Sequence, residues 1–290
     1  MSALWNPMPE MTGDVFLGVG RLADARAQFW RDAEIAEANG DADGLAVAAL
    51  GLGGIWVHEH RSTLEQAWVE SLQRHALAGL DPDSSLAHRI DVRLTAEEAY
   101  LVGDPTPVLD VLERARTAGD PIVLAEALSL AHHCVLGPHH ASLRLALADE
   151  LIAVSPGTGR PLDGLMGLAW RMVDLFLMGD RRALRALAEL RERLEVDRCD
   201  GLRYLVSSVE VTLAVRDGRL DDAEELAGGV LRARPGRGRR RRAGMVRRSR
   251  RTRRRRSQGA GDSSGGHVRR DSSSGLISPT SFPSGSATIA

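Results

Sequence analysis

Helix start and stop signals recur along this chain, and they are clearest between Gly103 and Gly137. This stretch holds two helix-length runs whose ends are marked by Gly103-Asp104-Pro105, Gly119-Asp120-Pro121 and Gly137-Pro138. Glycine ends helices in the left-handed conformation, aspartate caps the next helix, and proline is favoured at its first position. The stretch therefore predicts one antiparallel helix pair with short connections.

Similar pairs recur along the chain. The expected first helices end near Gly40, Gly79, Gly119, Gly157 and Gly201, and the expected second helices end near His60, Gly103, Gly137, Gly179 and Gly218. Both series advance by roughly 40 residues, a period typical of helix-pair repeats. No segment shows the alternation expected of strands. We predict an all-α fold, an α-solenoid of antiparallel helix pairs over residues 21–233, preceded by an irregular arm at residues 1–20.

Two expected second helices, residues 121–136 and 162–178, are apolar nearly all round, which predicts that neighbours enclose them. The first leaves a narrow polar stripe of Glu126, Ser129 and His133, and the second leaves one that includes Arg171 and Asp174. Arg171 and Asp174 stand three residues apart and can form a structural ion pair. The functional alternative is that these residues line a groove for an acidic or peptide ligand.

Charge divides the chain into two unlike parts. Residues 1–233 hold 22 Arg against 37 Asp and Glu, whereas residues 234–290 hold 16 Arg against 2 Asp. The second part is rich in Arg, Gly and Ser without apolar periodicity, so we predict a disordered basic tail. Its densest groups are Arg239, Arg240, Arg241, Arg242, Arg253, Arg254, Arg255 and Arg256.

Three interpretations of this tail stay open. A clustered basic segment can bind the phosphate backbone of nucleic acids through counterion release. The tail can instead be solvated and associate with the acidic body. The third interpretation is translation out of frame, because GC-rich DNA read in the wrong frame yields Arg, Gly, Ser and Pro. The abrupt loss of the helix pattern after residue 231 favours this third interpretation.

The residue types offer little catalytic chemistry. The chain contains no Lys, which excludes a Walker-type phosphate loop and a Schiff-base enzyme. No nucleophile, base and orienting group can be placed together from their spacing. A zinc hypothesis would use His58, His60, His132, His133, Cys134, His139 and His140. Their spacing matches no familiar zinc site, so we expect ordinary buried or interface histidines and neither a metal nor another cofactor.

The cysteine content and the length of the apolar runs indicate the cellular compartment in which we expect the protein. Cys134 and Cys199 alone do not make a disulfide framework in 290 residues. The first 20 residues show no secretory signal. The most apolar run, residues 162–178, is interrupted by charges and is shorter than the roughly 20 residues of a membrane span. We therefore expect a cytoplasmic protein that does not enter a membrane.

Three segments carry a family resemblance: Ala48-Ala49-Leu50-Gly51-Leu52-Gly53-Gly54, Leu124 to His133, and Gly218 to Glu224. They resemble the tetratricopeptide-like repeat regions of large actinobacterial transcriptional regulators of the LuxR/MalT and AfsR/SARP kind. The likeness covers roughly residues 21–231, although no repeat meets the strict tetratricopeptide pattern. In those regulators the repeat region is a sensory or protein-interaction module that accompanies an ATPase module and a helix-turn-helix, neither of which is visible here.

The resemblance implies a partial or stand-alone module. Because no catalytic set of residues can be placed from the sequence, we expect a protein that is not an enzyme. Helical solenoids commonly present an extended concave surface to a protein or peptide partner, and we expect the same here. Two alternatives remain. One is a nucleic-acid-associated protein that acts through the Arg-rich tail, and the other is a sensor that binds a small ligand among the second helices.

Overall fold

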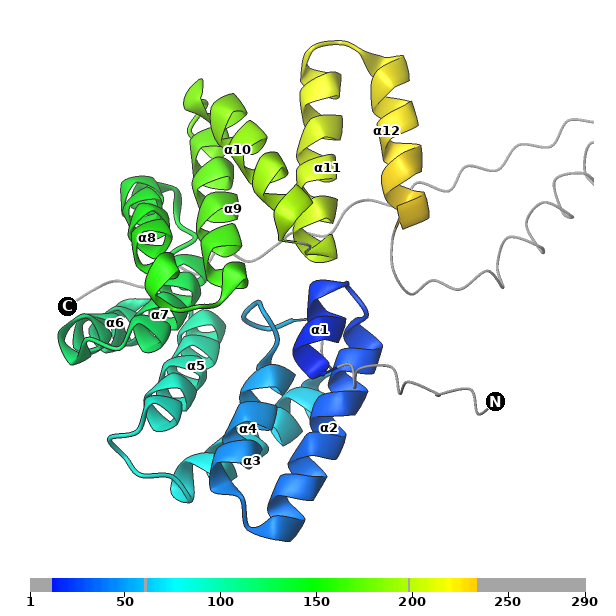
Figure 1. Cartoon of the computed structure of the whole chain (residues 1–290). Helices are drawn as coiled ribbons and strands as arrows, with labels where there is room; N and C mark the ends of the chain where they lie inside the picture. Colours follow the sequence, from blue (N-terminus) through cyan, green and yellow to red (C-terminus); the bar gives the residue numbers. More distant parts are fainter. Residues whose placement is uncertain (1–11, 60–61, 198, 234–290) are drawn as a thin grey trace, which may run out of the picture. The chain divides into compact units, whose positions relative to one another are not determined.

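The computed structural model describes residues 12–59, 62–197 and 199–233, and every regular element in these ranges is helical. Figure 1 shows a succession of helices joined by short connections. The α-helices are α1 (Gly13–Gly18), α2 (Leu22–Asn39), α3 (Ala42–Gly53), α4 (Thr63–Ala78), α5 (Ser85–Val102), α6 (Thr106–Ala118), α7 (Pro121–Cys134), α8 (Ala141–Val154), α9 (Pro161–Leu177), α10 (Arg182–Val196), α11 (Asp200–Arg216) and α12 (Leu220–Ala233). Two 3-10 turns, η1 (Pro138–His140) and η2 (Ser155–Gly157), flank α8. The all-α prediction is confirmed for the described residues.

The helix ends around α6 and α7 follow the predicted signals with two exceptions. Pro105, not Asp104, is the N-cap of α6, so the prediction that Asp104 caps this helix and that Pro105 is its first residue is wrong. Gly103 and Gly119 end α5 and α6 in the left-handed conformation, with φ of 76° and 77°. The carboxylate of Asp120 accepts hydrogen bonds from two backbone amides of α7, and Pro121 opens that helix. Gly137 has a φ of −58° and leads into η1, so the prediction that it closes α7 in the left-handed conformation is wrong.

Two segments near the N-terminus differ from the sequence-based expectation. The arm predicted to be irregular contains α1, which packs against α2. Gly13 permits this contact, since a Cβ at that position would stand 2.4 Å from the ring of Phe29. The helix predicted to reach about residue 58 ends at Gly53, and the chain turns at Gly54 with a φ of 78°. Residues 54–59 then form a loop in which His58 has a φ of 53°.

The packing follows the order of the helices in the chain. Consecutive helices contact one another, as α2 and α3, α8 and α9, and α11 and α12 do (Figure 1). The second helices of successive pairs also touch: α3 contacts α5, α5 contacts α7, and α7 contacts α9. Four helices therefore surround α7, as its nearly continuous apolar surface predicts. Gly167 lets α9 approach α8 closely, since a Cβ there would stand 3.0 Å from the backbone nitrogen of Ile152.

The largest apolar core joins α5 to α11. Its fully buried side chains include Leu112, Leu128, Leu151, Met172 and Leu190, each at most 1% exposed. Burial of one such side chain contributes roughly 1.5–3 kcal/mol. Smaller clusters connect α2 to α5. The Arg groups of the predicted basic tail, at residues 239–242 and 253–256, lie outside the described residues.

Candidate functional site

A cleft of about 700 Å³ lies among the helices that the sequence predicts as second helices of the pairs. Residues of α3, α5, α7 and α9 form its walls, together with α1 and the ends of α10 and α11. Ligand cavities in proteins usually measure about 300–1,000 Å³, so this cleft is large enough for a small molecule or a short peptide segment.

Alternating charges cross one wall of the cleft from α5 to α9. Arg89 donates to the carboxylate of Glu126 over 2.7 Å. The guanidinium of Arg160 lies 3.6 Å from the same carboxylate and donates to Asp163 over 2.8 Å. Burial by itself would lower the pKa of Arg160, but the hydrogen bond and charge of Asp163, with those of Glu126, raise it above its ordinary value. We call these four residues the charge ladder.

Local structure before α9 explains how Arg160 reaches the cleft. Gly159 has a φ of 66°, which turns the chain directly before α9. The Thr158 hydroxyl donates to the carbonyl of Ser155 and accepts from the backbone amide of Arg160 over 3.1 Å. Asp163 stands in the first turn of α9, where the helix dipole favours a negative charge.

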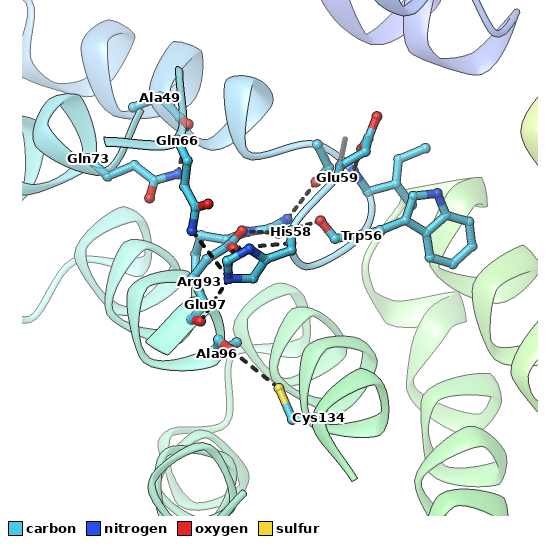
Figure 2. A network of polar contacts seen from close by, with 12 residues as sticks. Ala49, Trp56, His58, Glu59, Gln66, Gln73, Arg93, Ala96, Glu97 and Cys134 are labelled. Atoms are coloured by element: carbon cyan, nitrogen blue, oxygen red, sulfur yellow. Dashed lines mark hydrogen bonds and ion pairs between the residues drawn. The ribbon is translucent and has the colours of Figure 1, made fainter. Parts of the chain in front are cut away.

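A second polar network fixes the loop that follows α3 (Figure 2). The buried guanidinium of Arg93 on α5 donates to the carbonyl oxygens of Gly54 over 2.5 Å and Trp56 over 3.2 Å. The carboxylate of Glu97 accepts a hydrogen bond from the backbone amide of His58 over 3.1 Å. Gly54 and Arg93 both line the cleft, so this network holds one part of its wall in place.

Position 54 requires glycine, both for its backbone conformation and for its contact with Glu59. Besides its positive φ, a Cβ at Gly54 would lie 2.1 Å from a carboxylate oxygen of Glu59. That carboxylate accepts from the backbone amide of Ile55 over 3.0 Å and pairs with Arg26 of α2 over 3.4 Å. The loop thus depends on contacts that reach it from α2 and α5.

The two cysteines do not act as activated nucleophiles. Burial raises the pKa of the Cys134 thiol to about 12, and burial also raises the pKa of Cys199, which lines the cleft. The Cys134 thiol donates to the carbonyl of Ala96 over 3.4 Å (Figure 2). A thiol that stays protonated at neutral pH is a poor nucleophile and a poor metal ligand.

The five groove residues expected from the sequence do not share one site, since only two of them line the cleft. Glu126 and Ser129 line the cleft. His133 lies outside it, with ring centroids 5.4 Å from Tyr100 and 5.7 Å from Trp170. Burial, followed by the nearby charges of His132 and Arg93, lowers the pKa of His133 to about 4.

Arg171 and Asp174 do not pair with each other, so that prediction is wrong. Arg171 pairs with Glu189 of α10 over 2.5 Å. Asp174 is fully buried, and its two oxygens lie 2.7 Å from His132 and 2.7 Å from Arg144. This buried triad of His132, Arg144 and Asp174 ties α7, α8 and α9 together. Contacts between helices, rather than spacing along one helix, select the partners.

Sequence reasoning missed three members of the charge ladder, namely Arg89, Arg160 and Asp163. Only the polar stripe on residues 121–136 signalled the cleft, through Glu126 and Ser129. A comparable signal was available in the Gly-Arg-Pro sequence at residues 159–161, where a turn places an arginine beside the start of a helix. In the described ranges, no group of three or more His, Cys, Asp or Glu side chains could hold a metal ion.

The comparisons with known proteins add no relative. No protein-family model, curated protein or solved structure matches this chain. Among the residues described, no helix combines the length and the apolar character needed to cross a membrane.

Proposed function

We propose that the chain is a non-enzymatic binding module, an α-solenoid that takes a peptide segment of a partner protein into the cleft of its second helices. The observation that carries the proposal is the lining of the cleft by one helix from each of four successive pairs, α3, α5, α7 and α9. A repeat architecture brings equivalent helices to a common face, and such faces commonly bind extended partners.

The chemistry of the lining supports binding rather than reaction. The polar side chains of the charge ladder are paired arginines and carboxylates, and apolar residues such as Leu50, Ile122 and Met166 surround them. Cavities of this kind use apolar contacts for affinity and a few placed polar groups for orientation. The resemblance to repeat regions of transcriptional regulators supports the further proposal that the partner belongs to a regulatory protein.

A binding assay with a cleft-blocking variant tests the proposal. The full chain is titrated into a fluorescently labelled pool of random nonapeptides with acetylated and amidated ends, and binding is followed by fluorescence anisotropy. Ser129→Trp places a large side chain in the cleft, and Asp110→Trp places the same side chain on α6, which contributes no residue to it. We expect the wild type and Asp110→Trp to bind and Ser129→Trp to lose binding. Equal binding by the two variants would contradict the proposal.

A second candidate function is a sensor for a small ligand, favoured by the 700 Å³ volume of the cleft. A ligand that binds only the folded chain raises its melting temperature. A thermal-shift screen of small metabolites against the wild type and Ser129→Trp would identify such a ligand, which should stabilise only the wild type. A screen without any stabilising compound would leave the peptide as the better candidate.

A further inference from the structure

We propose that the peptide in the cleft is held by an uncharged aliphatic side chain, such as leucine, that packs against the exposed valines of the lining. This inference rests on the proposed function, because it names the chemistry of the ligand that the same cleft takes. Two properties of the lining carry it: most of its charges are already paired within the chain, and some of its large apolar side chains are exposed.

Most charged groups of the lining have partners in the chain itself. The charge ladder joins four of them into consecutive ion pairs. Arg93 donates to two backbone carbonyls of the loop after α3, and Asp197 pairs with Arg193 over 2.6 Å. Among the described residues, only Asp14, which is exposed on α1, lines the cleft as a charge without such a partner. A charged ligand residue would therefore compete with pairs that already exist.

Large apolar side chains of the same lining are exposed to solvent. Val47 on α3 is 49% exposed, and Val196 at the end of α10 is 77% exposed. Ile122 of α7 and Leu162 of α9 are half-buried in the lining. Single exposed apolar residues are common on protein surfaces, but here helices from separate repeats bring them to one concave site. An apolar ligand side chain that covers them removes apolar surface from water.

An aliphatic side chain gains more from this lining than a charged one does. Full burial of a leucine side chain corresponds to roughly a tenfold to hundredfold gain in affinity. A charged side chain would lose its hydration on entering the cleft, and the paired groups of the charge ladder offer it little in return. The lining therefore favours a ligand segment that is apolar where it meets the valines.

The test compares four nonapeptide pools that differ only in a fixed central residue, which is leucine, asparagine, arginine or glutamate. Each labelled pool has acetylated and amidated ends, is titrated with the full chain, and is followed by fluorescence anisotropy. Asparagine has nearly the branched outline of leucine but is polar, so this pair of pools isolates the apolar contact. We expect the leucine pool to bind about tenfold more tightly than the asparagine pool, and the two charged pools to bind no more tightly than the asparagine pool.

A double variant removes the valines that carry the inference. Val47→Ser combined with Val196→Ser should reduce the preference for leucine over asparagine from about tenfold to about threefold or less. The matched control combines Ile35→Ser on α2 with Leu184→Ser on α10, whose side chains are 60% and 58% exposed and do not line the cleft. This control should keep the preference. Thermal unfolding checks that both double variants are folded. If the cleft variant fails to fold, Val47→Thr with Val196→Thr keeps the branched shape and should still weaken the preference.

The outcomes separate this inference from the proposed function. If the asparagine, arginine or glutamate pool binds as tightly as the leucine pool, the inference is wrong and the proposed function stands. A tighter arginine pool would indicate that the carboxylates of Asp14 and Asp197 select the ligand instead of the valines. The inference is also wrong if the cleft variant keeps the whole preference, or if the control loses it to the same extent. If none of the pools binds, the proposed function itself is wrong.

Discussion

The buried triad of His132, Arg144 and Asp174 allows a stability prediction that depends on three helices at once. Asp174 on α9 is 0% exposed and pairs with His132 of α7 and Arg144 of α8. Arg144 also donates to the carbonyls of Val135 and Gly137 over 3.0 and 2.9 Å. Asp174→Asn removes the negative charge and leaves the guanidinium buried with neutral acceptors only.

The expected loss of stability is large. Removing one partner of a buried ion pair costs about 3–5 kcal/mol, because the remaining charge stays buried without compensation. The matched control is Asp149→Asn, since Asp149 is 55% exposed and lies 3.8 Å from Arg171. Pairs of that kind contribute about 0–1 kcal/mol. Urea unfolding followed by circular dichroism would measure both free energies of unfolding.

Replacing the whole triad sharpens the test. The triple variant with His132→Leu, Arg144→Met and Asp174→Leu carries no buried charge, and such replacements are often close to neutral. We therefore expect the triple variant to be more stable than Asp174→Asn alone. A loss below about 1 kcal/mol for Asp174→Asn, or a triple variant less stable than the single one, would refute the reasoning.

Three further predictions concern the loop, the histidines and the tail. Gly54→Ala should destabilise the chain by about 1–3 kcal/mol in urea unfolding, because it adds backbone strain and a clash with Glu59. The control is Gly201→Ala in α11, whose Cβ meets no atom within 4 Å, and this variant should be neutral or stabilising. The pKa of His133 is about 4 in the folded chain and 6.5 in the unfolded chain. As the pH falls, the unfolded chain therefore takes up the proton first, and the free energy of unfolding should drop by about 1–2 kcal/mol from pH 7 to pH 5. His133→Asn should reduce that pH slope, and an unchanged slope would contradict the assignment to His133. If the basic tail binds nucleic acid, binding of duplex DNA should weaken steeply as the salt concentration rises and vanish when residues 235–290 are deleted. DNA binding that survives the deletion would exclude the tail as the binding segment.

The helices could be predicted because their signals are local. Gly103, Gly119 and Asp120 act on the helix ends beside them, so a single sequence is enough to locate the adjoining ends of α5, α6 and α7. The predicted end of α3 was wrong because residues far away in the sequence fix the loop that follows this helix. The loop after α3 depends on Arg93 and Glu97 of α5, which lie 39 residues further along the chain than the groups they bind.

The candidate site was harder to predict than the helices for a related reason. The polar stripe on α7 pointed to Glu126 and Ser129, but periodicity along one helix cannot tell which residues of other helices face it. Asp174 shows the consequence, because its partners lie 42 and 30 residues away, and Arg171 three residues away is not among them. The pairing of Arg160 with both Glu126 and Asp163 has no signature along one helix, since it joins the segment before α9 to α7.

The central claim is that the cleft of the second helices receives a peptide. Photo-crosslinking tests it most directly, with p-benzoylphenylalanine placed at Ser129 in the cleft or at Asp110 on α6, and with the random nonapeptide pool as the probe. We predict a covalent peptide adduct at position 129 and none at position 110, as read by mass spectrometry. Equal adducts at both positions, or an adduct at position 110 alone, would contradict the claim.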